Sequence, residues 1–193
     1  MSIRDAFQMP TPMTISGRSS SITAAFVSAI IPQIEPTDEE VKTALDILQM
    51  SPDNVSCAYC GAQATEWDHL RPLVANQNPT GFISEIRNLV PSCGKCNQSK
   101  GNKYWMDWIA SDAKLSPKSR QVTDLQQRIA RLEEYERWGN VMAIDLRSMV
   151  PPDAWEQHRA NWGAVLKMMT DAQFHATILK RMIEEKTRDL IRH

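Results

Sequence analysis

The chain has 193 residues, 42% of them hydrophobic and 23% charged, which is typical of one folded domain or of a small module with an elaboration around it. No apolar run approaches the roughly 20 residues that span a bilayer, and the apolar segment 24–34 lacks the basic start and cleavage site of a signal peptide. We therefore expect an intracellular, cytoplasmic protein with no membrane partner. The formal net charge of −1 excludes a uniformly basic protein.

Residues 1–50 predict a polar arm followed by one helix. The first 22 residues are polar, and a short apolar segment then ends at Pro32. Thr37 is a good helix N-cap, and Glu40, three residues later, completes a capping box. The apolar residues that follow have helical spacing and form one stripe: Val41, Ala44, Leu45 and Leu48.

The segment after residue 116 is expected to be helical. Apolar residues recur every three or four positions from Val122 to Leu132, which predicts an amphipathic helix that reaches about Trp138. The carboxylates at 133, 134 and 136 are most simply interpreted as a solvated face of this helix.

Two prolines at 151–152 interrupt the chain before its last helical segment. Asp153 is a candidate cap for a helix that begins there, and Thr170 with Gln173 forms a second possible capping box. These signals predict two successive helices, of which the last ends at about Ile191.

The four cysteines form two C-x2-C pairs separated by 32 residues: Cys57, Cys60, Cys93 and Cys96. Each pair sits on a tight turn that brings two thiols to one side, and two such turns supply the four soft ligands of a tetrahedral structural zinc site. Two disulfides are the alternative, which an intracellular setting disfavours. A zinc held by four thiolates has a closed coordination sphere, so we expect one structural zinc per chain and no catalysis at it.

Basic residues gather within the stretch 95–131. This stretch contains three acidic residues and eight basic ones: Lys95, Lys100, Lys103, Lys114, Lys118, Arg120, Arg128 and Arg131. A local basic patch is what phosphate binding requires, although an ordinary solvated face is an equally good interpretation of the composition.

Three short motifs lie around the cysteine pairs: W-D-H-L-R-P at 67–72, E-I-R-N-L-V-P at 85–91, and C-G-K-C-N-Q-S-K-G-N-K at 93–103. Together, in this order, they resemble the HNH (ββα-metal) endonuclease family, specifically its zinc-knuckle members with a D-H…N…N pattern. The resemblance covers about residues 55–108.

The resemblance implies a role for each matching residue. His69 would be the general base that takes a proton from the attacking water, and Asp68 with Asn97 would ligate a catalytic Mg²⁺ or Mn²⁺. Asn88 would brace the hairpin so that His69 stays aimed. The family fold implies a first strand at 67–70, a second strand at or beside 88–90, and a helix that begins near Asn97.

Physical chemistry favours the same assignment, because an imidazole suits proton transfer near neutral pH and a loosely held cation can stabilise charge on a phosphate. Arg71, Lys100 and Lys103 are candidate phosphate clamps, with ordinary surface as the alternative. We expect the aromatic residues after the motifs, Tyr104, Trp105 and Trp108, to pack the module onto flanking helices rather than to stack on bases.

The sequence therefore predicts an α+β, predominantly helical protein in three parts: an N-terminal arm and helix at 1–50, an HNH core at 51–115, and C-terminal helices at 116–193. The expected function is metal-dependent hydrolysis of double-stranded DNA by a restriction-type (type II-like) or other defence nuclease of a prokaryote or phage. A homodimer is expected, because a two-fold protein matches a palindromic site and cuts both strands. Alternatives are a nicking, homing, phage-packaging or toxin nuclease, or an effector subunit controlled by a partner. A zinc-ribbon nucleic-acid-binding module without catalysis is the alternative of another class.

Overall fold

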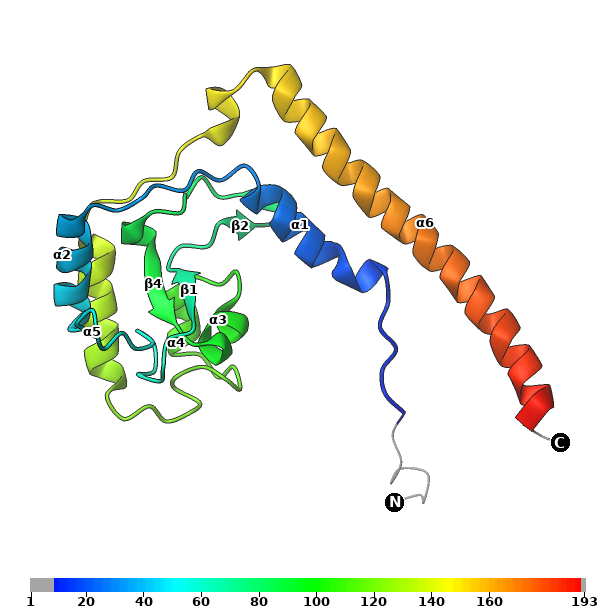
Figure 1. Cartoon of the computed structure of the whole chain (residues 1–193), viewed down its shortest axis with the longest axis horizontal. Helices are drawn as coiled ribbons and strands as arrows, with labels where there is room; N and C mark the ends of the chain where they lie inside the picture. Colours follow the sequence, from blue (N-terminus) through cyan, green and yellow to red (C-terminus); the bar gives the residue numbers. More distant parts are fainter. Residues whose placement is uncertain (1–8, 192–193) are drawn as a thin grey trace. The chain divides into compact units, whose positions relative to one another are not determined.

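The computed structural model describes residues 9–191, which belong to two compact units (Figure 1). One unit spans Val27–Met149 and contains all four cysteines and the three motifs. The other combines the beginning of the chain, up to Phe26, with its end, from Val150 onward. The architecture is α+β and predominantly helical, as the sequence predicts.

The larger unit is built around a short antiparallel hairpin and the helix that follows it. Strand β1 (Glu66–His69) pairs with β4 (Leu89–Ser92), and helix α3 (Gly94–Lys100) comes directly after β4 and packs on β1. The hairpin positions agree with the predicted ones. The helix begins three residues before the expected Asn97, because Cys93 already stands at its N-cap position.

The rest of this unit consists of short elements that enclose the hairpin. A two-residue ribbon, β2 (Val74–Ala75) with β3 (Asn78–Pro79), and the 3-10 helix η3 (Ile86–Asn88) lie between β1 and β4. Helix α2 (Asp38–Leu48) starts at the predicted Thr37–Glu40 capping box. Three further elements follow α3: α4 (Trp105–Ile109), α5 (Leu125–Arg137) and η4 (Leu146–Met149).

One core joins the hairpin to these helices. The largest fully buried side chains include Trp105 and Trp108 from α4, Tyr59 from the first cysteine turn, and Leu132 and Tyr135 from α5. In Figure 1, α2 and α5 lie side by side on one side of the hairpin and α3 on the other. Both tryptophans therefore pack the module onto its flanking helices, as predicted.

The carboxylate of Glu136 is an exception to the expected solvated face of α5. It is 15% exposed, and it accepts hydrogen bonds from Tyr104 Oη and from Trp105 Nε1 (3.1 Å), beside the guanidinium of Arg71 at 3.3 Å. The interpretation of Glu136 as a solvated residue was wrong, because the helical face it lies on turns toward α4 rather than toward water.

The compact units do not follow the boundaries expected at residues 50 and 115. Helices α2 and α5 share the core that surrounds the hairpin and the cysteines, so sequence on both sides of the expected module completes its fold. The reason is physical: a hairpin with a single short helix buries too little apolar surface to be stable by itself.

The smaller unit consists of η2 (Ser16–Arg18), most of α1 (Ser19–Ser28) and one long helix, α6 (Pro152–Ile191). The N-terminal segment runs antiparallel along α6: Trp162 Nε1 donates to Thr23 Oγ1 at 3.2 Å, and the backbone N–H of Ile15 donates to Gln173 Oε1 at 2.7 Å.

The predicted break at Thr170 was wrong. Helix α6 is continuous, and the Thr170 hydroxyl donates to the carbonyl oxygen of Leu166 one turn earlier at 3.0 Å instead of capping a new helix. No glycine or proline stands near this position to interrupt the backbone hydrogen bonds.

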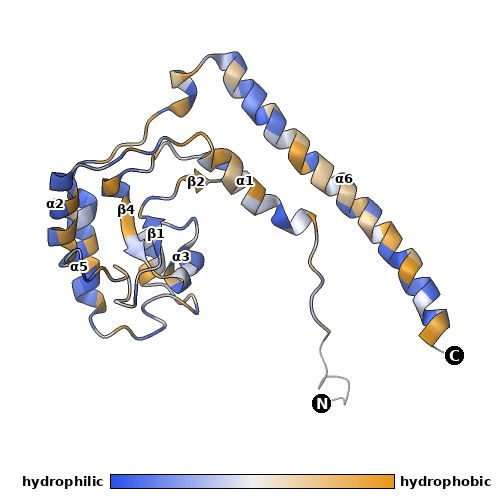
Figure 2. Cartoon of the chain, in the orientation of Figure 1, coloured by the Kyte–Doolittle hydropathy of each residue, from blue (hydrophilic) through white to orange (hydrophobic). Residues whose placement is uncertain are grey.

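Apolar side chains on the C-terminal half of α6 remain exposed. Hydrophobic residues continue to the end of this helix (Figure 2), and they include Phe174, Ile178, Leu179, Met182 and Ile183. Charged residues alternate with them, and within residues 9–191 no helix has the length and apolar character needed to cross a membrane.

Candidate active site and metal centre

The four cysteines converge in the larger unit. Their Sγ atoms all lie within 4.8 Å of one another, and Cys60 Sγ lies 3.7 Å from Cys93 Sγ. A tetrahedral zinc site with Zn–S bonds of about 2.3 Å places its sulfurs roughly 3.8 Å apart. A disulfide requires about 2.05 Å, and all four thiols are free. The geometry therefore fits a four-thiolate metal site and not the disulfide alternative.

Each cysteine pair is held by local backbone structure. In the first turn, Gly61 N donates to the carbonyl oxygen of Cys57 at 2.8 Å, and Gly61 has a φ of +76°, in the left-handed region that favours glycine. In the second, Cys96 lies in the first turn of α3. The cluster consequently ties the chain before β1 to the start of the helix after β4.

Two arginines of the basic stretch lie against this cluster. Arg120 Nη2 donates to Cys96 Sγ at 2.8 Å, and Arg128 Nη1 donates to the carbonyl oxygen of Cys57 at 3.2 Å. A metal with four thiolates carries excess negative charge, which a neighbouring guanidinium offsets. These two residues support the metal centre, so they are not part of a free basic surface.

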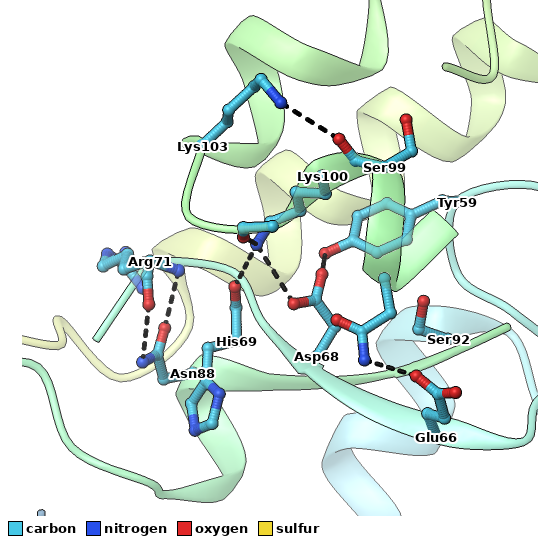
Figure 3. Close-up of polar contacts among 12 residues, drawn as sticks. Tyr59, Glu66, Asp68, His69, Arg71, Asn88, Ser92, Ser99, Lys100 and Lys103 are labelled. Carbon is cyan, nitrogen blue, oxygen red and sulfur yellow. Dashed lines mark hydrogen bonds and ion pairs between the residues drawn. The ribbon is translucent and has the colours of Figure 1, made fainter. Parts of the chain in front are cut away.

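Asp68 lies on the face of β1 that α3 covers. Its Oδ2 accepts from Tyr59 Oη at 2.7 Å, and its Oδ1 lies 3.2 Å from the ammonium of Lys100, which also donates to the carbonyl oxygen of His69 at 2.7 Å (Figure 3). Burial raises the pKa of Asp68, while the charge of Lys100 opposes this rise. Burial likewise lowers the pKa of Lys100.

Lys100 thus takes a different position from the one expected of a phosphate clamp. Its side chain is 1% exposed, and its ammonium is directed into the interface between β1 and α3. Arg71 is also turned inward, where Nη2 donates to the carbonyl oxygen of Glu136 at 3.0 Å. Of the three candidate clamps, only Lys103 is exposed at the surface.

Asn97 faces the same strand from α3, one helical turn before Lys100. Its Nδ2 donates to Glu66 Oε2 at 2.6 Å, and Glu66 lies two residues before Asp68 on the same face of β1. Because the amide nitrogen makes this hydrogen bond, the side-chain carbonyl oxygen of Asn97 is left as a candidate metal ligand. One carboxylate and one amide oxygen are ligand types that Mg²⁺ prefers. In this structure both carboxylate oxygens of Asp68 are engaged by Tyr59 and Lys100, so a cation there would have to displace one of these contacts.

The Asp68–Asn97 site differs from the thiol cluster because it does not have a closed set of protein ligands. Within the described part of the chain, the cysteines are the only group of three or more Cys, His, Asp or Glu residues whose ligand atoms converge. A cation at Asp68 and Asn97 would keep most of its coordination for water and substrate, which catalytic rather than structural ions require.

The imidazole of His69 lies on the opposite face of β1 from the Asp68 carboxylate, as alternation along a strand requires (Figure 3). Its Nε2 lies 2.8 Å from Ser84 Oγ. Burial, aided by the charge of Lys100, lowers the pKa of His69 to about 4. The ring is therefore neutral near pH 7, which is the state that can accept a proton.

Asn88 connects the chain after β1 to the chain before β4. Its Oδ1 accepts from the backbone N–H of Arg71 at 2.9 Å, and its Nδ2 donates to the carbonyl oxygens of Arg71 and Ile83, both at 3.2 Å. The side chain is fully buried. Four sequence candidates, Asp68, His69, Asn88 and Asn97, thus lie around one hairpin and its helix.

Sequence reasoning missed three residues that contact these candidates, Tyr59, Glu66 and Ser84. It also did not predict that Arg120 contacts Cys96. A signal existed for Glu66, because a residue two positions before Asp68 on a strand shares its face. The others contact the site from loops, and no periodicity relates a loop residue to its spatial neighbours.

Comparisons with known proteins find a family model that matches the part of the chain around this site. Residues 57–103 match the family model described as HNH endonuclease, so an HNH-type nuclease domain occupies about a quarter of the chain. A 59-residue segment is 41% identical to the CRISPR-associated endonuclease Cas9 of Corynebacterium diphtheriae. That segment is 28% of this chain and 5% of the relative, so the chain corresponds to a small part of the relative's length. No solved structure matches.

Proposed function

We propose that the chain, whose residues 57–103 form an HNH-type nuclease domain, is a metal-dependent endonuclease that hydrolyses phosphodiester bonds of double-stranded DNA. The observation that supports this most is the arrangement on β1. A neutral imidazole and a carboxylate stand on adjacent residues, and α3 brings the amide of Asn97 to the strand face on which Asp68 lies.

In this proposal the chain's own groups divide the reaction between them. His69 accepts a proton from the attacking water, because its pKa keeps the ring neutral at pH 7. Asp68 and Asn97 would hold Mg²⁺ or Mn²⁺, which supplies a positive charge for the phosphate and the leaving oxygen. Asn88 holds the two ends of the intervening segment at the hairpin, so His69 is kept in place.

The test is cleavage of a long mixed-sequence DNA by the zinc-loaded protein with Mg²⁺ or Mn²⁺, followed by sequencing of the ends. Replacing His69 with alanine should lower the rate by about 10²–10⁴. His158→Ala is the matched control, since this histidine lies on α6 in the other unit and bonds to the carbonyl oxygen of Phe26. A His69→Ala protein that keeps more than about a tenth of the rate would remove His69 from this role.

We also propose that the enzyme acts as a homodimer of restriction type or in another defence role. The described residues contain one candidate catalytic centre per chain, whereas cutting a duplex requires two cleavages, which a two-fold dimer supplies. The exposed apolar side chains at the end of α6 are the candidate contact. A nicking, homing, phage-packaging or toxin enzyme, or a partner-controlled subunit, would instead give single-strand breaks or a monomer.

A non-catalytic zinc-ribbon module predicts a different result. Such a protein would bind DNA equally well with and without the His69 imidazole, and it would not cleave with any cation. The placement of His69 and Asp68 on adjacent positions of β1, with Asn97 brought to the same strand by α3, favours the enzyme, because groups of this chemistry gathered at one place are typical of catalytic sites.

A further inference from the structure

The His69 ring has one specific polar neighbour outside its own strand. Its Nε2 lies 2.8 Å from the hydroxyl oxygen of Ser84, a residue in the segment between β3 and η3. Among the described residues, the other ring nitrogen, Nδ1, has no hydrogen-bond partner. The two nitrogens therefore differ: one is engaged by the protein, and the other is available to a water molecule.

Ser84 is itself held in place by backbone hydrogen bonds. Its N–H donates to the carbonyl oxygen of Pro32 at 3.1 Å, and its carbonyl oxygen accepts from Ile34 N–H at 2.9 Å. The neighbouring carbonyl of Ile83 accepts from Asn88. The segment 32–34 lies outside the residues that match the family model, yet it determines where the Ser84 hydroxyl stands.

A neutral imidazole carries one N–H and one lone pair, and its hydrogen bonds decide which nitrogen carries the proton. If Nε2–H donates to Ser84 Oγ, the lone pair is on the unpartnered Nδ1, which can accept a proton from water. If Ser84 donates instead, the proton is on Nδ1 and the lone pair is consumed by the serine. Only the first tautomer provides a base.

We propose that Ser84 is a positioning residue for His69: its hydroxyl accepts a hydrogen bond from Nε2–H, selects the tautomer with a basic Nδ1, and fixes the ring. The inference rests on the proposed role of His69 as the base. The proton taken from water goes to Nδ1, and Ser84 keeps its own proton throughout. The Nε2–H···Oγ bond persists in the resulting imidazolium, where the positive charge strengthens it.

The experiment compares wild type, Ser84→Ala and Ser84→Thr. The control is Ser148→Ala, because Ser148 is exposed on η4 and its hydroxyl donates to the carbonyl oxygen of Asp145. Nitrogen-15 NMR of histidine-labelled, zinc-loaded protein without DNA reports which His69 nitrogen carries the proton. We expect Nε2–H in wild type and in Ser84→Thr, and a mixture of tautomers in Ser84→Ala. The kcat of Ser84→Ala should fall about tenfold with little change in KM, as expected for one hydrogen bond, and Thr should restore it.

Two results would overturn the proposal. One is an Nδ1–H tautomer of His69 in wild type, and the other is a Ser84→Ala protein whose tautomer and kcat match those of wild type. Failure of the proposed function looks different: either wild type does not cleave DNA with any cation, or His69→Ala cleaves it as fast as wild type, whatever the tautomer. A folding defect in Ser84→Ala is recognised by loss of the signals of the other histidines. Failure of Ser84→Thr to restore kcat counts against a positioning role.

Discussion

The ammonium of Lys100 lies 3.2 Å from Asp68 Oδ1 and 2.7 Å from the carbonyl oxygen of His69. The buried ammonium of Lys100, the last residue of α3, thus contacts two adjacent residues of β1. Both partners of the pair are nearly inaccessible, with side chains 1% and 6% exposed. A buried charge that loses its partner is strongly destabilising, so this contact is open to a direct test.

Replacing Lys100 with alanine should lower the free energy of unfolding by about 3–5 kcal/mol, because it leaves the Asp68 carboxylate buried without a counter-charge. Lys103→Ala, at an exposed lysine three residues later, should change it by no more than about 0.5 kcal/mol. Urea unfolding at saturating zinc measures both. The double variant Asp68→Asn with Lys100→Met should recover much of the loss, and equal effects of the two single lysine changes would contradict the pair's importance.

Elemental analysis of protein purified without added metal should find one zinc per chain, since the four Sγ atoms already lie within 4.8 Å of one another. Cys60→Ser should lose the zinc and unfold the larger unit, because the metal joins the segment before β1 to α3. Circular dichroism and near-ultraviolet signals from the buried tryptophans would report this. Ser56→Ala is a neighbouring control that retains all four ligands, and a zinc-free protein with native signals would refute the structural role.

Local patterns predicted much of the fold around the site. The Thr37–Glu40 capping box and the two C-x2-C turns depend on residues close in sequence, and the structure has both. The hairpin was expected from the family resemblance, and β1 pairs with β4 at those positions. The break expected at Thr170 also rested on a local pattern, but a threonine inside a helix can bond to the preceding turn instead. Capping residues indicate a helix start only where the backbone has another reason to break.

The sequence did not predict which groups the long basic side chains contact. Lys100 and Arg120 stand in the stretch 95–131, whose composition suggests a basic surface, and Arg71 was expected to be a phosphate clamp, yet each is bonded to an internal acceptor. Those acceptors come from β1, α5 and α3, and their positions depend on tertiary packing. Burial of a lysine requires a specific counter-charge, which one sequence does not reveal.

We expect Asp68→Ala and Asn97→Ala to raise the Mg²⁺ concentration needed for half-maximal cleavage, with Asp68 the more sensitive because it alone supplies charge. Zinc content should stay at one per chain in both variants, since neither residue touches the thiols. Asn102→Ala, at an exposed asparagine beyond α3, is the control. If neither variant changes the Mg²⁺ dependence, the cation lies elsewhere.

The proposed homodimer should depend on the end of α6. Replacing the exposed Leu179 and Ile183 with glutamate should convert a dimer to a monomer in light scattering, because charges would then face the apolar contact. Lys167→Glu, on the same helix at an exposed polar position, should leave the oligomeric state unchanged. A wild-type protein that is monomeric at concentrations active in cleavage would remove the dimer from the proposal.

The last prediction concerns the lysines that remain on the surface. Half of the eight basic residues between 95 and 131 bond to internal acceptors or to Asp124: Lys100, Arg120, Arg128 and Arg131. Lys95 on α3 and Lys103 just beyond it are exposed, so they are the better candidates for phosphate contacts.

Each phosphate contact releases condensed cations, and the logarithm of the binding constant then falls against the logarithm of salt concentration with a slope near −0.9 per contact, roughly. Changing Lys95 and Lys103 to alanine should therefore make the slope shallower by about one to two units and weaken binding to all sequences alike. Lys42→Ala, at an exposed lysine on α2, is the matched control. Fluorescence anisotropy on two unrelated duplexes across a salt series gives the slopes. A double variant with an unchanged slope but an altered preference between the duplexes would mean that these lysines contact bases, so that α3 would enter a groove instead of lying along the phosphates.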